Sequence, residues 1–277
     1  MANLDDLHRQ RLERWGQTLQ TCIADPGGAA DLIRRVGLAT LFPASPEVPN
    51  LFHAYTGDPA AQTQTKWNSP AGRVYGWRWA LGRPALAFYT AIVRGRPTWV
   101  SWDLLPAVLR LCGELRAPET LHAAGALSAG ASRIAQVLAD CGGVLSTGDL
   151  RALAGYPTGK AERAAYLRAI AELDRRLLLA KVFAEGDDDM RHALVTVQYP
   201  QHVAAAERLS REAAMEQLLK TYLPNASYAL PVPLAKHLTL PEAEVRAGLE
   251  RLVEARQVAP ETFLGQRATC YVWIEQR

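Results

Sequence analysis

The 277-residue sequence lacks the features that identify several common classes of enzyme and membrane protein. Its four cysteines are scattered and form no C-x-x-C pair, which argues against a zinc site and a dense disulfide framework. No apolar run is long enough to cross a bilayer, and the polar, charged N-terminus does not resemble a signal peptide. A Gly-rich dinucleotide fingerprint, a P-loop, an H-E-x-x-H motif and a nucleophile elbow are also missing. We therefore expect a cytoplasmic protein that uses neither metal nor cofactor and does not bind a membrane.

The sequence also lacks a large excess of charge of either sign, because it has 31 Lys and Arg residues and 28 Asp and Glu residues. This mildly basic balance permits nucleic-acid binding without demanding it, since a strongly basic domain is the clearer electrostatic footprint. Hydrophobic residues make up 49% of the chain and charged residues 21%, so the chain can bury ordinary cores and is not of the disordered class. Its length admits one large domain or about two to three small ones.

Residues 131–198 carry a pattern of three helices followed by a β-hairpin. Apolar residues at helical spacing, such as Ile134, Val137 and Leu138, give the first helix one buried face. Thr147 is suited to cap the second helix. The expected elements are helices at 131–140, 147–154 and 160–176 and strands at 177–183 and 193–197. This order is that of a winged helix, a helix-turn-helix core with a β-hairpin wing.

The same pattern recurs in residues 210–275. Its apolar positions come in the same order, and Pro157 and Pro241 follow the second helix of the two copies. A second hairpin is expected from strands at 258–263 and 269–274. Chance is the alternative explanation, because apolar helical patterns are common, but the shared order and lengths favour a repeat. The predicted fold is mainly α with small β-hairpins, in a tandem winged-helix arrangement, with a helical region at 1–130, a winged helix at 131–198, and a connector with a C-terminal winged helix at 199–277.

The N-terminal region is expected to be helical around one long irregular segment, residues 42–70. That segment carries prolines at 43, 46, 49, 59 and 70. A loop of this length inside a compact chain is usually functional or covered by other elements. The expected helices lie at 1–24, 29–40, 74–81, 84–93 and 103–115, with an extended segment at 98–101.

Aromatic residues are concentrated between positions 75 and 102, where basic residues are interleaved with them. A hydrophobic core between helices is the ordinary explanation for most of these rings, and a stacking surface for bases is the alternative. Basic residues among aromatics suit a site that holds a nucleic-acid backbone and stacks an unpaired base. The candidate nucleic-acid-binding residues of this region are Arg73, Arg78, Arg94 and Arg96.

The helix expected at 160–176 is the candidate DNA reader, because the third helix of a winged helix usually lies in the major groove. Lys160, Arg163 and Arg168 suit phosphate contacts, which supply most non-specific affinity. Acidic residues on the same helix and in the turn at 187–189 oppose such contacts. A solvated surface and a protein-binding surface therefore remain alternatives for this helix.

The order of these elements resembles the AlkZ/YcaQ-like crosslink-repair DNA glycosylases, a family built from tandem winged helices. The resemblance covers roughly residues 30–277, and its landmarks are the Gln62-Thr63-Gln64 triplet, the segments 75–79 and 93–99, and the two winged-helix units. In that family a Gln-x-Gln or Gln-x-Asp motif carries the catalytic residues, so the resemblance implies that Gln62 and Gln64 are catalytic. It also implies a degenerate third winged helix within residues 29–116.

This sequence departs from the family pattern at two points. Thr63 is polar, whereas the family prefers an apolar residue between the two catalytic side chains. Family members also continue past the last winged helix into a C-terminal β-domain, whereas this sequence ends at Arg277, so we expect a relative without that domain.

The resemblance implies a DNA-repair hydrolase, a monofunctional glycosylase that acts on duplex, alkylated DNA. A cationic N-alkylated purine is already a good leaving group, so a carboxamide pair needs only to orient water and to stabilise an oxocarbenium-like sugar. If a base were required, Asp58 and Asp103 are the nearby carboxylates, although a turn and a helix start are their ordinary roles. A non-catalytic winged-helix DNA-binding regulator or protein-interaction module is the alternative function, and the sequence leaves the lesion and the oligomeric state open.

Overall fold

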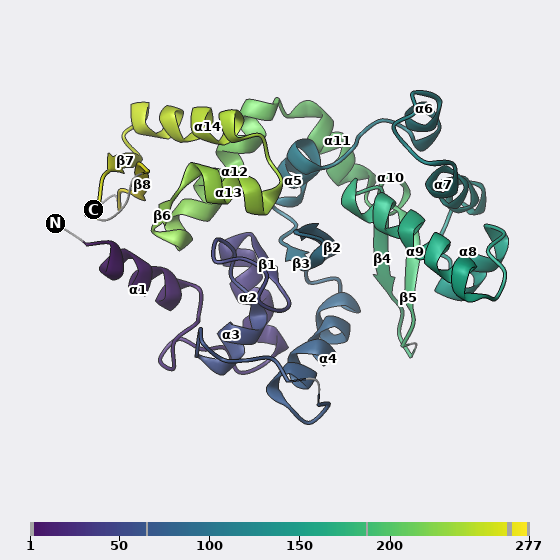
Figure 1. The fold of residues 1–277 in the computed structure, drawn as a ribbon, viewed down its shortest axis with the longest axis horizontal. Coiled ribbons are helices and arrows are strands. Elements are labelled where there is room, and N and C mark those ends of the chain that lie inside the picture. Colours follow the sequence, from purple (N-terminus) through teal and green to yellow (C-terminus); the bar gives the residue numbers. More distant parts are fainter. Residues whose placement is uncertain (1–2, 65, 187, 265–267, 276–277) are drawn as a thin grey trace.

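The computed structural model describes residues 3–64, 66–186, 188–264 and 268–275 of the chain. These residues form a mainly helical protein with three small antiparallel sheets (Figure 1). The mainly α character with small β elements agrees with the prediction. No helix within the described ranges is long and apolar enough to cross a membrane.

The chain repeats one order of elements, which is helix, strand, helix, helix, strand, strand. In the first unit the strand after the first helix pairs with the last strand, which also pairs with the second strand. The first unit consists of α2 (Pro26–Val36), β1 (Leu38–Thr40), α3 (Leu51–Thr56), α4 (Pro70–Gly82), β2 (Phe88–Val93) and β3 (Arg96–Val100).

The second and third units follow the same scheme. The sheet of the third unit has the same strand order, and in the second unit a bridge between Leu145 and His192 takes the place of the first strand. The second unit consists of α7 (Ala129–Cys141), α8 (Thr147–Leu153), α9 (Lys160–Arg175), β4 (Leu179–Phe183) and β5 (Met190–Leu194). The third unit consists of α12 (Arg211–Ala226), β6 (Tyr228–Ala229), α13 (Pro231–Leu238), α14 (Glu242–Glu254), β7 (Val258–Glu261) and β8 (Cys270–Trp273).

Five further helices of the described residues connect these units or flank them. The helix α10 follows β5 directly, and α11 leads into the third unit. The helix α5 follows β3 and packs against α12, so it joins the first unit to the third. The five are α1 (Leu4–Arg14), α5 (Leu105–Cys112), α6 (Pro118–Ala123), α10 (Val195–Gln198) and α11 (Pro200–Arg208).

Local sequence explains where the helices of the first unit begin. Asp25 caps α2 by accepting a hydrogen bond from the Gly28 amide, and Pro26 occupies the first helical position. Ser69 caps α4 by accepting from the Gly72 amide, and Pro70 follows in the same way. These side chains satisfy amides that would otherwise have no partner at a helix start.

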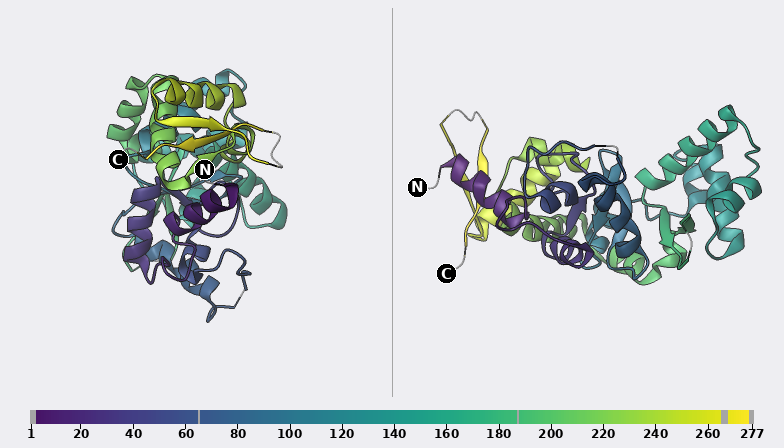
Figure 2. Two further views of the ribbon diagram at one scale, coloured as in Figure 1. Left: turned by 90° about the vertical axis from the view of Figure 1, so that its left-hand side faces the viewer. Right: turned by 90° about the horizontal axis from the view of Figure 1, so that it is seen from below.

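The first and third units share one hydrophobic core, whereas the second unit has a core of its own. Buried residues of α2, α4, β3 and α5 belong to the same cluster as those of α12 and α14. A separate cluster is formed by α7, α8, α9 and the neighbouring strands. In Figure 2 the second unit accordingly projects at one end of the elongated molecule.

A buried arginine holds α1 against the third unit. The Arg11 side chain is 2% exposed and donates to the carbonyls of Ala226 and Tyr228 at 2.8 and 2.5 Å. Its guanidinium also lies 3.4 Å from the Glu47 carboxylate, which accepts a hydrogen bond from the Tyr222 hydroxyl. One carboxylate and carbonyls from a distant part of the chain therefore compensate this buried charge, which would be costly if left alone.

The hairpin of the second unit docks on the first unit through Phe183. Its ring packs against Trp79, Tyr89 and Trp99, with ring centroids 5.4 to 5.9 Å apart. Gly82 makes room for this ring, because a Cβ there would lie 2.2 Å from its Cδ2 atom. This aromatic contact between the two units therefore requires a glycine at position 82.

Phe183→Ala is expected to lower the free energy of unfolding by about 3 kcal/mol, since it empties a buried aromatic site. Gly82→Ala should destabilise the same joint by forcing the ring to move. Urea denaturation followed by tryptophan fluorescence measures both effects, with Leu167→Ala on the exposed face of α9 as the control. A loss no larger than that of the control would show that the ring contacts do not stabilise the joint.

Several elements differ from those predicted for the N-terminal region. The helix expected at 1–24 ends at Arg14, and Gly16 follows with a φ of +70°. The helix expected at 29–40 ends at Val36, after which the chain enters β1. Residues 84–93, predicted to be helical, contain the strand β2, because Phe-Tyr-Thr-Ala-Ile-Val is rich in aromatic and β-branched residues that pair with β3.

Other corrections concern loops and helix starts. The segment expected to be irregular contains α3, which Asn50 caps through its side chain. The strand expected at 193–197 lies at Met190–Leu194, and α10 follows it. Ser146 rather than Thr147 caps α8. Asp187, in the predicted acidic turn, lies outside the described residues. In the aromatic segment Trp77, Phe88 and Trp99 are buried and the other rings are partly buried against the same core, so the core explanation holds there.

Candidate functional site

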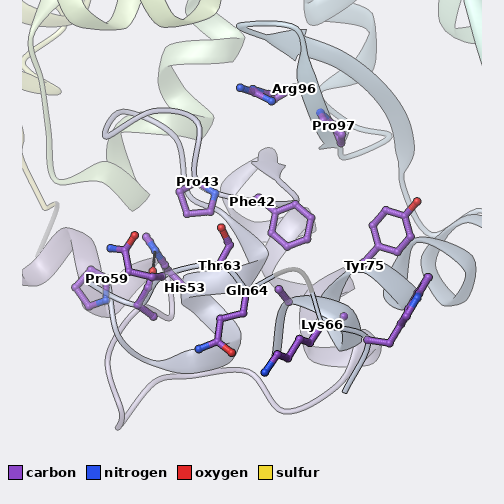
Figure 3. Close-up of a pocket in the computed structure, with 15 residues that line it drawn as sticks. Phe42, Pro43, His53, Pro59, Thr63, Gln64, Lys66, Tyr75, Arg96 and Pro97 are labelled. Carbon is purple, nitrogen blue, oxygen red and sulfur yellow. Dashed lines mark hydrogen bonds between the residues drawn. The ribbon is translucent and has the colours of Figure 1, made fainter. Parts of the chain in front are cut away.

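An open pocket of about 820 Å³ lies on the first unit (Figure 3). Its walls come from the chain after β1, from the loop between α3 and α4, from the first turns of α4 and from the start of β3. In the view of Figure 3, Arg96 and Pro97 lie on the opposite side from Gln64 and Lys66, with Phe42 between them. Four separate segments of one unit therefore line the space.

The chemistry of the pocket is amide, aromatic and cationic. Two carboxamides, two positive side chains and three aromatic rings line it, and none of its described lining residues is an aspartate or a glutamate. Its size falls in the range of small-molecule and nucleotide sites, about 300–1,000 Å³. These side chains are Gln62, Gln64, Lys66, Arg96, Phe42, Trp67 and Tyr75.

Gln62 and Gln64 lie in a segment that is neither helix nor strand. Both side chains are exposed and both line the pocket. Side chains two residues apart in an extended segment lie on the same side of the chain, whereas a helix would separate them by about 200°. The Gln62 side-chain amide donates to the Ala60 carbonyl at 3.1 Å. Within the described part of the chain, the side-chain amide of Gln64 has no hydrogen-bond partner. The two carboxamides can therefore reach one target.

His53 links α3 to the segment that carries Gln62 and Gln64, and its hydrogen bonds define its tautomer. The Asn50 Oδ1 atom accepts a hydrogen bond from the His53 amide at 2.8 Å, so the Asn50 Nδ2 group faces His53 Nδ1, 3.1 Å away. Because Nδ2 can only donate, Nδ1 is the acceptor and Nε2 carries the proton. Nε2 then donates to the Ala61 carbonyl at 3.2 Å. His53 thus holds the residue that precedes Gln62.

The environment keeps His53 neutral. Burial is the main cause that lowers its pKa below the ordinary value of 6.5, against smaller opposing effects of the Ala61 carbonyl and of Asp58. A neutral imidazole that already donates its proton to a carbonyl is not a free general base. The sequence signal that could have found this residue is the Asn-x-x-His spacing at the start of α3.

The predicted basic residues of the first unit lie in or beside the pocket. Arg96 lines it, and Arg94 is in the turn between β2 and β3, where it donates to the Ala44 carbonyl at 3.2 Å. Arg73 is exposed on α4 and donates to the Tyr55 hydroxyl at 3.1 Å. The Arg78 guanidinium stacks on the ring of Tyr75, 3.7 Å from its centroid.

The predicted basic residues of the second unit do not line this pocket. Lys160, Arg163 and Arg168 are exposed along α9. Arg168 lines a smaller hollow of about 500 Å³ between α7 and α9, together with Tyr156 and Glu172. The Glu172 carboxylate already accepts hydrogen bonds there from the Ser128 backbone amide and hydroxyl.

The two carboxylates considered as bases are not among the pocket residues. Asp58 closes a turn by accepting from the Ala60 amide at 2.8 Å and is exposed. Asp103 lies just before α5, and its backbone carbonyl accepts from Gln217. Neither carboxylate is therefore placed to act as a base in the pocket.

One feature of the site, Trp67, was missed in the sequence. Its side chain is 76% exposed and lines the pocket, with its ring edge-on to Tyr75 at a centroid distance of 5.7 Å. It lies in the loop before α4, outside the aromatic segment that begins at Tyr75. A tryptophan beside a Gln-x-Gln triplet was the available signal.

Comparisons with known proteins give a family and a fold. Residues 23–238 match a family model described as AlkZ related. No curated protein matches the sequence. Among solved structures, the Streptomyces sahachiroi DNA glycosylase AlkZ is similar, with a TM-score of 0.59 and 14% sequence identity over 98% of this chain and 70% of that chain. At this identity the structural match establishes a shared fold.

Proposed function

Because this chain belongs to the AlkZ-related family, we propose that it binds DNA and releases alkylated purine bases by hydrolysis of the N-glycosidic bond. The observation that carries the proposal is the pocket in which Gln62 and Gln64 stand together without a carboxylate among the described lining residues. Such a site suits only a substrate whose base leaves readily.

A purine alkylated at N7 or N3 meets this requirement because it carries a positive charge. When the bond between C1′ and N9 breaks, the base takes the bonding electron pair and departs as a neutral molecule. The sugar becomes oxocarbenium-like, a water molecule adds to C1′, and its proton is released to solvent. Gln62 and Gln64 would orient that water and direct amide oxygens towards the developing charge, which is stabilisation by oriented dipoles.

We further propose that the three units are winged helices and that DNA passes the first of them. The shared sheet order supports this, since a strand after the first helix and a terminal hairpin are the parts of a winged helix. The hairpin of β2 and β3 would then be a wing, with Arg94 and Arg96 at its tip. Lys160, Arg163 and Arg168 on α9 would contact phosphates of the same duplex.

Arg94→Ala combined with Arg96→Ala is expected to weaken binding to all duplex sequences. Each lost phosphate contact removes about 0.9 from the slope of log affinity against log salt, so the slope should flatten by up to about two. Fluorescence anisotropy over a salt series measures both quantities. Arg9→Ala with Arg34→Ala removes the same charge from exposed positions on α1 and α2 and serves as the control. An unchanged slope in the first variant would exclude these residues from the interface.

A non-catalytic DNA-binding protein is the second candidate, and one observation favours it. Neither carboxamide is fixed by a partner in the pocket, since Gln62 bonds within its own segment and Gln64 is free among the described residues. Oriented catalytic groups are usually held by neighbours. A base-release assay on duplexes that carry N7- or N3-alkylpurines separates the two functions. Release by the wild-type protein supports the glycosylase, and its absence across several lesions supports the binding protein.

A further inference from the structure

Trp67 is exposed, whereas the other six tryptophans are buried or half-buried. It is 76% exposed, whereas Trp15, Trp77 and Trp99 are at most 8% exposed. An indole is large and mainly apolar, so folding normally covers most of it. Its exposure at the mouth of a pocket is the kind of feature that marks a binding surface.

The turn that presents this ring is built by specific contacts. The Ser69 hydroxyl donates to the backbone carbonyls of Gln64 and Lys66, at 3.1 and 2.5 Å, and so holds together the turn before α4 that contains Trp67. Gly72 lets the loop lie directly on α4, because a Cβ there would be 2.0 Å from the Trp67 carbonyl oxygen. The backbone that carries Trp67 is therefore held against the start of α4.

The indole is within reach of whatever the carboxamides bind. Trp67 is the third residue after Gln64, which limits their Cα atoms to a separation of about 11 Å, and both line the pocket. A sugar whose C1′ atom faced the carboxamides would carry its base within a few ångströms. The Trp67 ring is thus positioned for the base, while Gln62 and Gln64 are positioned for the sugar.

The free face of this ring distinguishes it from its aromatic neighbours. Arg78 already covers the Tyr75 ring at 3.7 Å, and Arg78 and Arg83 lie over Trp79 at 5.1 and 5.3 Å. Among the described residues, no guanidinium lies over Trp67. Of the aromatic side chains, tryptophan attracts a cation most strongly through the face of its ring.

The charges around the pocket give this ring a specific role. A neutral and a cationic purine have nearly the same shape, and no described lining residue is a carboxylate that could select the cation. Lys66 and Arg96 repel it, although they suit the phosphates that accompany it. The π face of an indole is then the group available to favour a positive base.

We propose that Trp67 is the stacking subsite for the alkylated purine and that its π face selects the cationic base over a neutral one of the same shape. The inference rests on the proposed function for the position of the sugar. It adds the residue that recognises the base and the property of the base that is recognised.

Equilibrium binding to a pair of matched duplexes tests the inference without requiring catalysis. One duplex carries N7-methylguanine on a 2′-fluoroarabinose, which resists hydrolysis, and the other carries 7-methyl-7-deazaguanine on the same sugar, which is neutral and has the same shape. The wild-type protein is expected to prefer the cationic duplex by about 3- to 30-fold, the range that a cation–π contact supplies. Trp67→Leu should abolish the preference, and Trp67→Phe should retain part of it.

Leu19→Ala is the matched control, because Leu19 is 75% exposed and lies away from the pocket lining. It should keep the preference of the wild type. Equal binding of the two duplexes by the wild type, or an unchanged preference in Trp67→Leu, overturns the inference. Fluorotryptophan at position 67 alone keeps the shape and weakens the π face, so it should reduce the preference even if leucine disturbs the loop.

Base release from the non-fluorinated cationic duplex is measured separately, so the two proposals can fail independently. A preference that depends on Trp67 without any base release would keep the stacking subsite and remove the hydrolytic function. Base release at the wild-type rate by Trp67→Leu, with an unchanged preference, would keep the glycosylase and remove the subsite.

Discussion

Alanine at both Gln62 and Gln64 is expected to reduce base release from alkylated duplex DNA by ~10²–10³-fold or more, because the loss of one oriented dipole at a developing charge typically has this effect. Both side chains line one pocket, so they can act on one water and one sugar. The two losses should not simply add, because residues that act together on one water are strongly coupled.

Duplex affinity should survive these substitutions, since the cations that suit phosphates lie on other residues. Single-turnover release measured beside anisotropy separates the rate from the binding. Gln136→Ala is the control, because Gln136 is an exposed carboxamide on α7 that bonds only to Asp140 on its own helix. Equal release by the double variant and the wild type would keep the enzyme and place its catalytic groups elsewhere.

The helices of the second and third units could be predicted from the sequence because their signals are local. Ile134 and Leu138 recur at helical spacing and are fully buried. Ser128 and Ser210 cap α7 and α12 through their hydroxyls, as short polar residues do at helix starts. Elements with a periodic apolar face and a capping residue thus require no knowledge of distant neighbours.

The strand β2 could not be assigned in the same way. A short apolar run fits a buried helix and a buried strand equally well, and pairing with β3 decides between them. The joint at Phe183 is also invisible locally, because its aromatic partners lie about ninety residues earlier in the chain. Contacts of this kind depend on the tertiary arrangement.

The candidate site was predicted in part. The family resemblance pointed to Gln62 and Gln64, and the mixture of basic and aromatic residues pointed to Arg96; the structure brings all three to one pocket. His53 and Trp67 were missed, because a histidine tautomer and an exposed fraction depend on surroundings that spacing does not give. Residue type therefore indicated the chemistry, while the fold determined which residues share a surface.

Acid is expected to destabilise the second unit, with His192 as the principal cause. His192 is 5% exposed and lies in the hairpin strand β5. The Lys181 ammonium, 3.4 Å from its Nδ1 atom, can only donate, so Nδ1 is the acceptor and Nε2 donates to the Thr147 hydroxyl at 3.2 Å. A second proton on this ring would be buried and would face an ammonium group.

The pKa of His192 falls accordingly from 6.5 to about 3, with burial as the main cause and Lys181 as the second. Below about pH 6.5, His192 binds a proton in the unfolded chain but stays neutral in the folded protein until the pH approaches 3. The contribution of neutral His192 to the free energy of unfolding is fully present above pH 6.5 and is lost as the pH falls towards 3. At about 1.4 kcal/mol per pH unit, the loss reaches up to about 5 kcal/mol at the low end.

Asp174 acts in the opposite direction over part of this range. It pairs with Lys181 at 3.0 Å, and burial raises its pKa above the ordinary value of 3.8. A carboxyl group that binds its proton more tightly when folded stabilises the fold as the pH falls. Its protonation also removes the partner of Lys181, which limits this gain. We expect the histidine to dominate between pH 6.5 and 4, where its unfolded form is already protonated.

His192→Asn provides the test, because the carboxamide oxygen can still accept from Lys181 while the side chain no longer titrates. The variant should lose some stability at pH 7.5 but show a much flatter decline between pH 6.5 and 4 than the wild type. Urea unfolding at half-unit pH steps measures the decline, and His8→Asn, at an exposed position on α1, should leave it unchanged. If His192→Asn retained the wild-type slope, the acid sensitivity would have to come from other groups, and the buried Lys181–His192 contact would have no part in it.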